Sequence, residues 1–177
     1  MKLSDYVVEC IADSGACDVF MLPGGGAMHL NDSLGRSDRV RYICNLHEQA
    51  CAIAAEAYAQ YTNNIGVCMV TTGPGSVNAL TGVAAAWMDS TPMLVVSGQV
   101  KRVDLCHGKG IRQLGFQEID IVSMVKPITK YAVTITDSSE VRYHMEKALW
   151  SARNGRPGPS WVDIPLDVQA VEIDPGA

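Results

Sequence analysis

Short apolar runs alternate with amphipathic segments along almost the entire chain. Helical spacing relates five apolar residues near its start: Leu3, Tyr6, Val7, Cys10 and Ile11. Ser4 stands where it would cap this helix, and Gly15 stands where it would end it. Further helices are predicted at about 27–34, 47–61, 77–88, 120–125 and 139–153. Strands are predicted at 19–22, 40–44, 65–71, 93–97, 131–135 and 160–164.

Alternation of short apolar strands with helices is typical of βαβ units, which build parallel sheets covered by helices on both faces. The sequence therefore predicts the α/β class, as a three-layer α/β/α sandwich around a central, mainly parallel sheet of about six strands. No internal repeat or low-complexity tract interrupts the pattern. We expect one domain over residues 1–170, with 171–177 as the start of a linker.

Composition narrows the class of protein. The chain has 177 residues, of which 47% are apolar and 19% charged, and its net charge is −5. A chain of this size buries roughly 70% of its unfolded surface, which is enough for a core without staples. The negative charge argues against nucleic-acid binding. No apolar run approaches the roughly 20 residues of a membrane span, and the first residues do not resemble a signal peptide, so we expect a soluble, cytoplasmic protein.

Six cysteines are scattered without a Cys-x-x-Cys pair: Cys10, Cys17, Cys44, Cys51, Cys68 and Cys106. Most lie in apolar segments, where a free thiol packs as a small hydrophobe. We expect reduced thiols in a reducing compartment, and a structural zinc site is the alternative.

Three loops follow predicted strands, where ligands bind in open parallel sheets: 23–26, 72–76 and 97–99. They do not match the common nucleotide motifs. His29 stands where a dinucleotide fingerprint has its third glycine, and Gly108-Lys109 is followed by Gly110 instead of the Ser or Thr of a Walker A loop. The Gly-x-Ser-x-Gly elbow of many hydrolases is absent too. The residues alone leave two readings open, tight turns or a ligand site.

Five segments, taken in their order along the chain, are more specific than these loops alone. They are 45–50 (NLHEQA) leading into an Ala-rich helix, 72–78 (TGPGSVN), 96–100 (VSGQV), 115–120 (GFQEID) and 155–159 (GRPGP). Together they resemble the N-terminal, pyrimidine-binding (PYR) domain of thiamin-diphosphate-dependent enzymes, most closely the acetolactate synthase-like branch. The resemblance runs from about Leu3 to Gln169, which makes residues 1–170 the expected PYR domain.

The resemblance implies a catalytic role for Glu48. In this family a glutamate hydrogen-bonds a pyrimidine ring nitrogen and favours the imino tautomer of the aminopyrimidine, which then takes the proton from the thiazolium ring. That role needs a carboxylate aimed from the end of a strand into a fairly dry site. The alternative is an ordinary glutamate at a helix N-terminus, where the helix dipole favours it.

The resemblance also implies which loops surround the cofactor. Near the aminopyrimidine and the substrate it places Pro23, Gly24 and Gly25. In a second cofactor loop it places Thr72, Gly73, Pro74, Gly75 and Asn78. Near the reacting carbons it places Phe116 and Gln117, beside Gly25. Glu118 and Asp120 are expected to be structural or solvated, and for His47 a packing or turn role is as plausible as a catalytic one. No partner is visible in the sequence for His29, His107 or His144.

The expected enzyme is a carboligase or decarboxylase, a lyase or transferase that acts on a 2-keto acid such as pyruvate. The family binds Mg²⁺ through Gly-Asp-Gly followed by Asn, and this chain has no such motif, so the resemblance assigns the metal to a domain outside it. The chain then supplies half of a site that the family forms between two subunits, and we expect it to be inactive alone and part of a homodimer or tetramer. A flavin (FAD) is left open. The alternatives are a separately encoded PYR subunit and a non-catalytic assembly module.

One segment departs from acetolactate synthases. Residues 102–114 form a longer stretch than the corresponding loop of those enzymes. It is more similar to a less-characterised group of related enzymes, some associated with unusual sugar or surface-polysaccharide chemistry. The identity of the substrate and product therefore stays open.

Overall fold

The computed structural model describes residues 1–106 and 108–175, and in them a single six-stranded sheet forms the centre. All strand pairs are parallel, in the order β2-β1-β3-β4-β6-β5. The strands are β1 (Asp18–Met21), β2 (Arg41–Cys44), β3 (Gly66–Val70), β4 (Met93–Gln99), β5 (Tyr131–Thr134) and β6 (Pro159–Pro165). The predicted three-layer α/β fold is confirmed.

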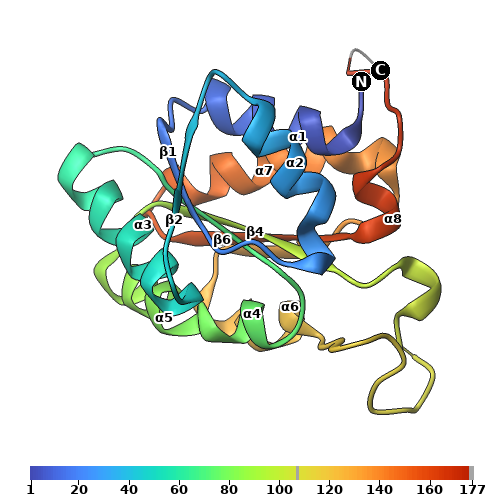
Figure 1. The fold of residues 1–177 in the computed structure, drawn as a ribbon. Coiled ribbons are helices and arrows are strands. Elements are labelled where there is room, and N and C mark those ends of the chain that lie inside the picture. Colours follow the sequence, from blue (N-terminus) through green and yellow to red (C-terminus); the bar gives the residue numbers. More distant parts are fainter. Residues whose placement is uncertain (107, 176–177) are drawn as a thin grey trace.

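Two groups of helices cover the two faces of the sheet (Figure 1). On one face lie α1 (Leu3–Asp13), α2 (Met28–Arg36), α7 (Val141–Arg153) and α8 (Leu166–Gln169). On the other lie α3 (Glu48–Thr62), α4 (Pro74–Asn78), α5 (Leu80–Asp89) and α6 (Ile121–Val125). Short 3₁₀ turns are η1 (Gly25–Ala27), η2 (Arg102–Asp104), η3 (Lys126–Ile128) and η4 (Ser138–Glu140).

The central strands are apolar throughout because both of their faces are buried. Along β3, Val67 and Met69 belong to the core under α1, α2 and α7, whereas Cys68 and Val70 belong to the core under α3 and α5. Successive side chains of a strand point to opposite faces, so one short apolar run contributes to both cores. The edge strand β2 differs, since all four of its residues are exposed.

The strand order determines where a ligand site can form. From β1 the chain continues outward to β2, and it then crosses back over β1 to β3 and proceeds to β4. The loop after β1 therefore runs towards β2, and the loop after the neighbouring strand β3 runs in the opposite direction, towards β4. This divergence opens a crevice at the carboxyl ends of β1 and β3. This is the edge of the sheet at which the sequence places its glycine-rich loops.

Three local predictions need correction. The N-cap of α1 is Lys2, not Ser4, because Ser4 lies buried in the first turn and accepts a hydrogen bond from the Ser33 hydroxyl (2.8 Å). The helix predicted over 77–88 is two helices, α4 and α5, since Pro74 starts a helical turn directly after the loop and the chain turns at Ala79. The short helix α8 was not predicted.

The thiols are less uniformly buried than the sequence predicts. All six are free, but Cys17 and Cys44 are exposed at the edge of the sheet, while Cys51 and Cys68 are buried. Burial raises the pKa of Cys51 to about 11, and the pKa of Cys68 also lies well above its usual range. None of the helices in the described part of the chain is long and apolar enough to span a membrane.

Candidate active-site cleft

A cleft of about 380 Å³ opens at the carboxyl ends of the central strands. Its lining comes from five segments: Gly24, Gly25 and Gly26 after β1, Thr71 and Thr72 after β3, Gln99 at the end of β4 with Val100, Lys101 and Asp104 after it, Phe116 and Gln117 from the turn before α6, and Leu166 at the start of α8. The crevice that the strand order creates is thus open and lined by both glycine-rich loops.

The glycine loop after β1 is held close to its neighbours. The Gly26 N–H donates to Thr71 Oγ1 (3.0 Å), and a Cβ on Gly24 would lie 2.5 Å from the Thr71 side chain. On the other side, a Cβ on Gly98 would lie only 2.1 Å from the Gly26 carbonyl oxygen. By contrast, a Cβ on Gly25 would meet no atom within 4 Å. The loop is therefore packed at both sides, and Gly25 presents bare backbone to the cleft.

The turn at 116–117 rests on the loop after β3. Gly73 has φ +64°, and a Cβ there would lie 2.0 Å from the Gln117 carbonyl oxygen. Gln117 itself adopts φ +57°, a conformation that non-glycine residues rarely take. Phe116, beside it, is 83% exposed. The second wall of the cleft thus depends on close backbone contact with Gly73.

Glu48 begins α3, where the sequence predicts it. His47 is the N-cap, and its Nδ1 accepts from the Gln49 N–H (3.1 Å). The half-buried Glu48 carboxylate accepts a hydrogen bond from Asn78 Nδ2 at Oε2 (2.9 Å). A Cβ on Gly75 would stand 3.2 Å from Oε1 and 2.7 Å from the Thr71 methyl group. The carboxylate is therefore oriented by one amide, and its second oxygen lies along glycine.

The predicted site residues fall into two adjoining groups. Gly24, Gly25, Thr72, Phe116 and Gln117 line the cleft. Glu48, Gly75 and Asn78 form the carboxylate cluster, and Gly73 supports the turn at 116–117. Pro23 is exposed at the start of the loop after β1, Pro74 is exposed at the first position of α4, and neither lines the cleft.

Sequence reasoning missed Thr71, which touches both groups. Its side chain contacts the loop after β1 and lies beside Gly75. It follows β3 directly, and its position before a glycine-rich loop is the only signal that the sequence offers. Sequence reasoning also missed Gln99 as a site residue, although Gln99 lies in the segment 96–100 that contributes to the family resemblance.

Comparison with known proteins identifies the family of the chain. Residues 1–124 match the family described as "Thiamine pyrophosphate enzyme, N-terminal TPP binding domain". The chain belongs to this family. The predicted resemblance is confirmed, and the cleft lies in the N-terminal domain of an acetolactate synthase-like thiamine pyrophosphate enzyme.

Proteins similar to this thiamine pyrophosphate (thiamin diphosphate) enzyme domain include acetolactate synthases of plants and bacteria. It is 38% identical over 177 residues to acetolactate synthase 2, chloroplastic, of Nicotiana tabacum, covering 98% of this chain and 25% of the relative. It is 38% identical over 170 residues to the acetolactate synthase large subunit of Lactococcus lactis, covering 96% of this chain and 28% of the relative. The chain thus spans about a quarter of the length of the relatives it matches.

A buried polar network lies beneath the cleft of this thiamine pyrophosphate enzyme domain. Asp163 on β6, 1% exposed, accepts from Ser97 Oγ (2.5 Å), Gln99 Nε2 (3.1 Å) and Thr134 Oγ1 (3.1 Å). Burial raises the pKa of Asp163 to about 7, although its three hydrogen bonds oppose the shift. The Asp163 carboxyl group therefore gains or loses its proton near neutral pH.

The carboxylate cluster fits the pyrimidine end of thiamin diphosphate. Glu48 Oε1 accepts no hydrogen bond from the described residues, and because Gly75 has no side chain its backbone lies next to this oxygen. A carboxylate beside bare backbone is a group that binds a heterocycle bearing ring nitrogens and an amine.

The remaining titratable candidates have structural partners. Glu118 accepts the backbone N–H groups of Cys106, Leu114 and Gly115, and these bonds hold its pKa below the usual range despite partial burial. Asp120 caps α6 by accepting from the Ser123 N–H (3.0 Å). These two carboxylates thus have the structural roles expected of them.

Neither His29 nor His144 lines the cleft. His144 contacts the Tyr131 hydroxyl (2.6 Å) on the opposite face of the sheet, and His29 lies half-buried in α2. His107 lies outside the described residues. No group of three or more His, Cys, Asp or Glu side chains in the described ranges could hold a metal ion.

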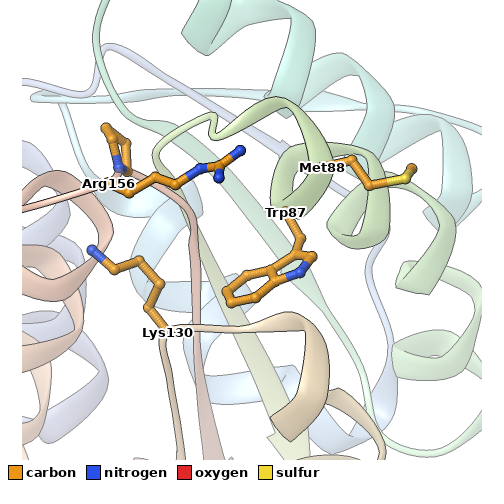
Figure 2. A pocket seen from close by; sticks show the side chains of 5 residues that line it. Trp87, Met88, Lys130 and Arg156 are labelled. Atoms are coloured by element: carbon orange, nitrogen blue, oxygen red, sulfur yellow. The ribbon is translucent and has the colours of Figure 1, made fainter.

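A second cavity, of about 300 Å³, lies at the amino ends of β4, β5 and β6, at the opposite edge of the sheet from this cleft. Its lining residues are Trp87, Met88, Lys130, Arg156 and Pro157 (Figure 2). Its two cations are bound to the ends of helices: Arg156 Nε donates to Ser90 Oγ (2.6 Å), the C-cap of α5, and the Lys130 ammonium donates to the Asn154 carbonyl, the C-cap of α7. Cations stabilise helix C-termini, which accounts for both without a ligand.

Proposed function

We propose that this chain is the pyrimidine-binding half of a thiamin-diphosphate-dependent carboligase or decarboxylase that acts on a 2-keto acid such as pyruvate. One observation carries the proposal. The Glu48 carboxylate is oriented by Asn78 with its Oε1 free of partners among the described residues, next to a glycine-lined cleft at the switch point of the sheet.

In this proposal Glu48 hydrogen-bonds a ring nitrogen of the aminopyrimidine and favours its imino form. The cofactor, when bound, supplies a nucleophilic carbon on its thiazolium ring. Asn78 keeps the carboxylate aimed, and the backbone of Gly25, where a Cβ would meet no atom within 4 Å, allows the heterocycle to approach closely. Proton transfer by a positioned group contributes typically about 10²–10⁴-fold to a rate, so the geometry of this one carboxylate governs turnover.

The substrate subsite of the proposal is the cleft next to the carboxylate cluster. Gly25 offers open space there, and Phe116 and Gln117 form the facing wall. Lys101, exposed at the rim, provides a cation for a carboxylate such as that of a 2-keto acid. The described parts of the 102–114 segment, residues 102–106 and 108–114, extend from this rim, away from the layered body (Figure 1), where they can influence which 2-keto acid enters.

The other half of the proposed site lies on a diphosphate-binding domain, which holds Mg²⁺ through oxygen ligands. We propose that exposed apolar side chains at the two ends of α3 contribute to the surface that meets it: Leu46, just before the helix, is 99% exposed, and Tyr61, near its far end, is 92% exposed. We propose a homodimer or tetramer in which this surface is covered, with FAD left open and this chain inactive alone. Residues 1–170 are the proposed domain.

The test uses the full-length protein and titrates thiamin diphosphate with Mg²⁺ by calorimetry, followed by an assay of pyruvate consumption. The proposal predicts saturable binding and turnover that depends on the cofactor. Absence of cofactor binding by the folded protein would overturn it.

The same exposed apolar surface also favours a second candidate, a non-catalytic assembly module. In that case analytical ultracentrifugation shows self-association or partner binding, while the cofactor titration shows no heat. A protein that stays monomeric at all concentrations and binds no partner contradicts this alternative. The remaining alternative, that this chain is a separately encoded PYR subunit, predicts turnover only after the chain is mixed with its partner subunit.

A further inference from the structure

Two walls of the cleft are joined by a single buried side chain, Gln99, the last residue of β4. It is 2% exposed. Its Oε1 accepts from Thr72 Oγ1 (2.7 Å) and from the Val100 N–H (3.0 Å). Its Nε2 donates to the Ile119 carbonyl (3.0 Å) and to Asp163 Oδ2 (3.1 Å). The amide therefore uses both donors and both acceptor sites.

These partners belong to different segments. Thr72 is in the loop after β3, and Ile119 ends the turn that carries Gln117. The two segments also touch directly, because the Gln117 carbonyl packs against Gly73. Gln99 thus sets the spacing between the loop that neighbours Glu48 and the wall that faces the substrate subsite.

Asp163 is one of three partners that fix which way the amide points, together with the Val100 N–H and the Ile119 carbonyl. A carboxylate only accepts, so it requires the NH₂ group of Gln99 on its side and leaves Oε1 facing Thr72. The other groups around Asp163 are hydroxyls, Ser97 on β4 and Thr134 on β5, and the charged group that acts on it is Asp120, at the start of α6. Protonated Asp163 becomes a donor and no longer imposes this orientation.

We propose that Gln99 is a positioning residue, whose amide, oriented by the Asp163 carboxylate, holds the Thr72 loop and the 116–117 turn at the separation that substrate binding requires. The proposal rests on the proposed function for its substrate. It assigns Gln99 to substrate binding and leaves orientation of the Glu48 carboxylate to Asn78.

The first test replaces the amide in the full-length protein by Gln99→Met, which keeps the volume and removes the hydrogen bonds. Hydrogen exchange of residues 72–75 and 115–119 is expected to accelerate in both segments by about tenfold or more, as one lost hydrogen bond of about 1.4 kcal/mol gives. The KM for pyruvate is expected to rise about tenfold, with kcat changing much less. The matched control is Thr91→Val, which removes another buried hydrogen bond (3.2 Å to Glu56) at the opposite end of β4.

The second test uses pH. As pH falls through about 7, wild-type Asp163 takes up a proton and remains buried, so the exchange of both segments, after correction for the intrinsic pH dependence of amide exchange, and the KM are expected to rise together. Asp163→Asn, which cannot titrate, is expected to show no such step. A purely structural role would change the stability of the whole chain with pH without moving the two segments and the KM together.

Each outcome decides the proposal. It is overturned if folded Gln99→Met leaves both segments and the KM within about twofold of wild type, if only one segment responds, or if Thr91→Val produces the same change. If Gln99→Met does not fold, the Asp163→Asn profile decides: loss of the step supports the proposal and its persistence overturns it. Failure of the proposed function is distinct, because a protein without thiamin diphosphate binding still reports the exchange of both segments.

Discussion

Gly98 is the position at which the structure predicts the sharpest effect of adding one methyl group. In Gly98→Ala the new Cβ would lie 2.1 Å from the Gly26 carbonyl oxygen, and backbone must move by about 0.9 Å before the separation reaches 3.0 Å. Both partners are backbone atoms, so no flexible side chain can yield. Overpacking of this kind costs about 1–3 kcal/mol, and we expect the upper end. For a chain of this length that corresponds to a fall in Tm of roughly 6–12 °C.

The same movement displaces the Gly24–Gly26 loop from the cleft, and a misplacement of about 1 Å can lower kcat/KM by 10²-fold. Urea denaturation of the chain and steady-state kinetics of the full-length enzyme measure the two effects. The matched control is Gly35→Ala in α2, where a Cβ would meet no atom within 4 Å. For this variant we expect the free energy of unfolding to rise by about 0.5–1 kcal/mol. If Gly98→Ala is as stable as wild type, the close packing of β4 against the loop is refuted.

Three further changes test other parts of the structure. Asn78→Ala removes the hydrogen bond to Glu48 and should lower kcat/KM by roughly tenfold to 10²-fold, as loss of about 1.5–3 kcal/mol implies, and unchanged kinetics would remove Asn78 from the site. Because the pKa of Asp163 is raised in the folded state, the free energy of unfolding falls as pH rises from about 4 to 7, by up to roughly 4 kcal/mol at 1.36 kcal/mol per pH unit. Urea denaturation at pH 5 and pH 8 should therefore show that Asp163→Asn is more stable relative to wild type at pH 8 than at pH 5. A thiol reagent at pH 8 should label the exposed Cys17 and Cys44 first, and should reach Cys68 only on unfolding; early labelling of Cys68 would contradict its burial.

Most of the fold could be predicted from the sequence because both faces of the central strands are buried. That burial gives unmistakable apolar runs, such as residues 66–70 and 93–97, between amphipathic segments. The boundaries failed where tertiary contacts outweigh local signals. Ser4 resembles a cap but is used to contact Ser33 across two helices, and the turn at Ala79 has no breaker residue to reveal it.

The site was only partly accessible to sequence reasoning. The motifs around Glu48 and Asn78 pointed to the carboxylate cluster, and the glycines pointed to the loops. Thr71 and Gln99 were missed because their role depends on which strands are neighbours. Gln99 meets Asp163 across a gap of 64 residues, and no local pattern records that β4 lies beside β6.

We propose that Glu48 activates thiamin diphosphate, and the Glu48→Gln variant of the full-length enzyme tests this role. The control is Glu56→Gln, two turns further along the same helix and pointing into a different contact, with Thr91. With thiamin diphosphate and Mg²⁺ saturating, the account predicts that Glu48→Gln still binds the cofactor but turns over substrate about 10²–10⁴-fold more slowly, while Glu56→Gln keeps wild-type turnover. Undiminished turnover by a folded, cofactor-bound Glu48→Gln enzyme would contradict the account.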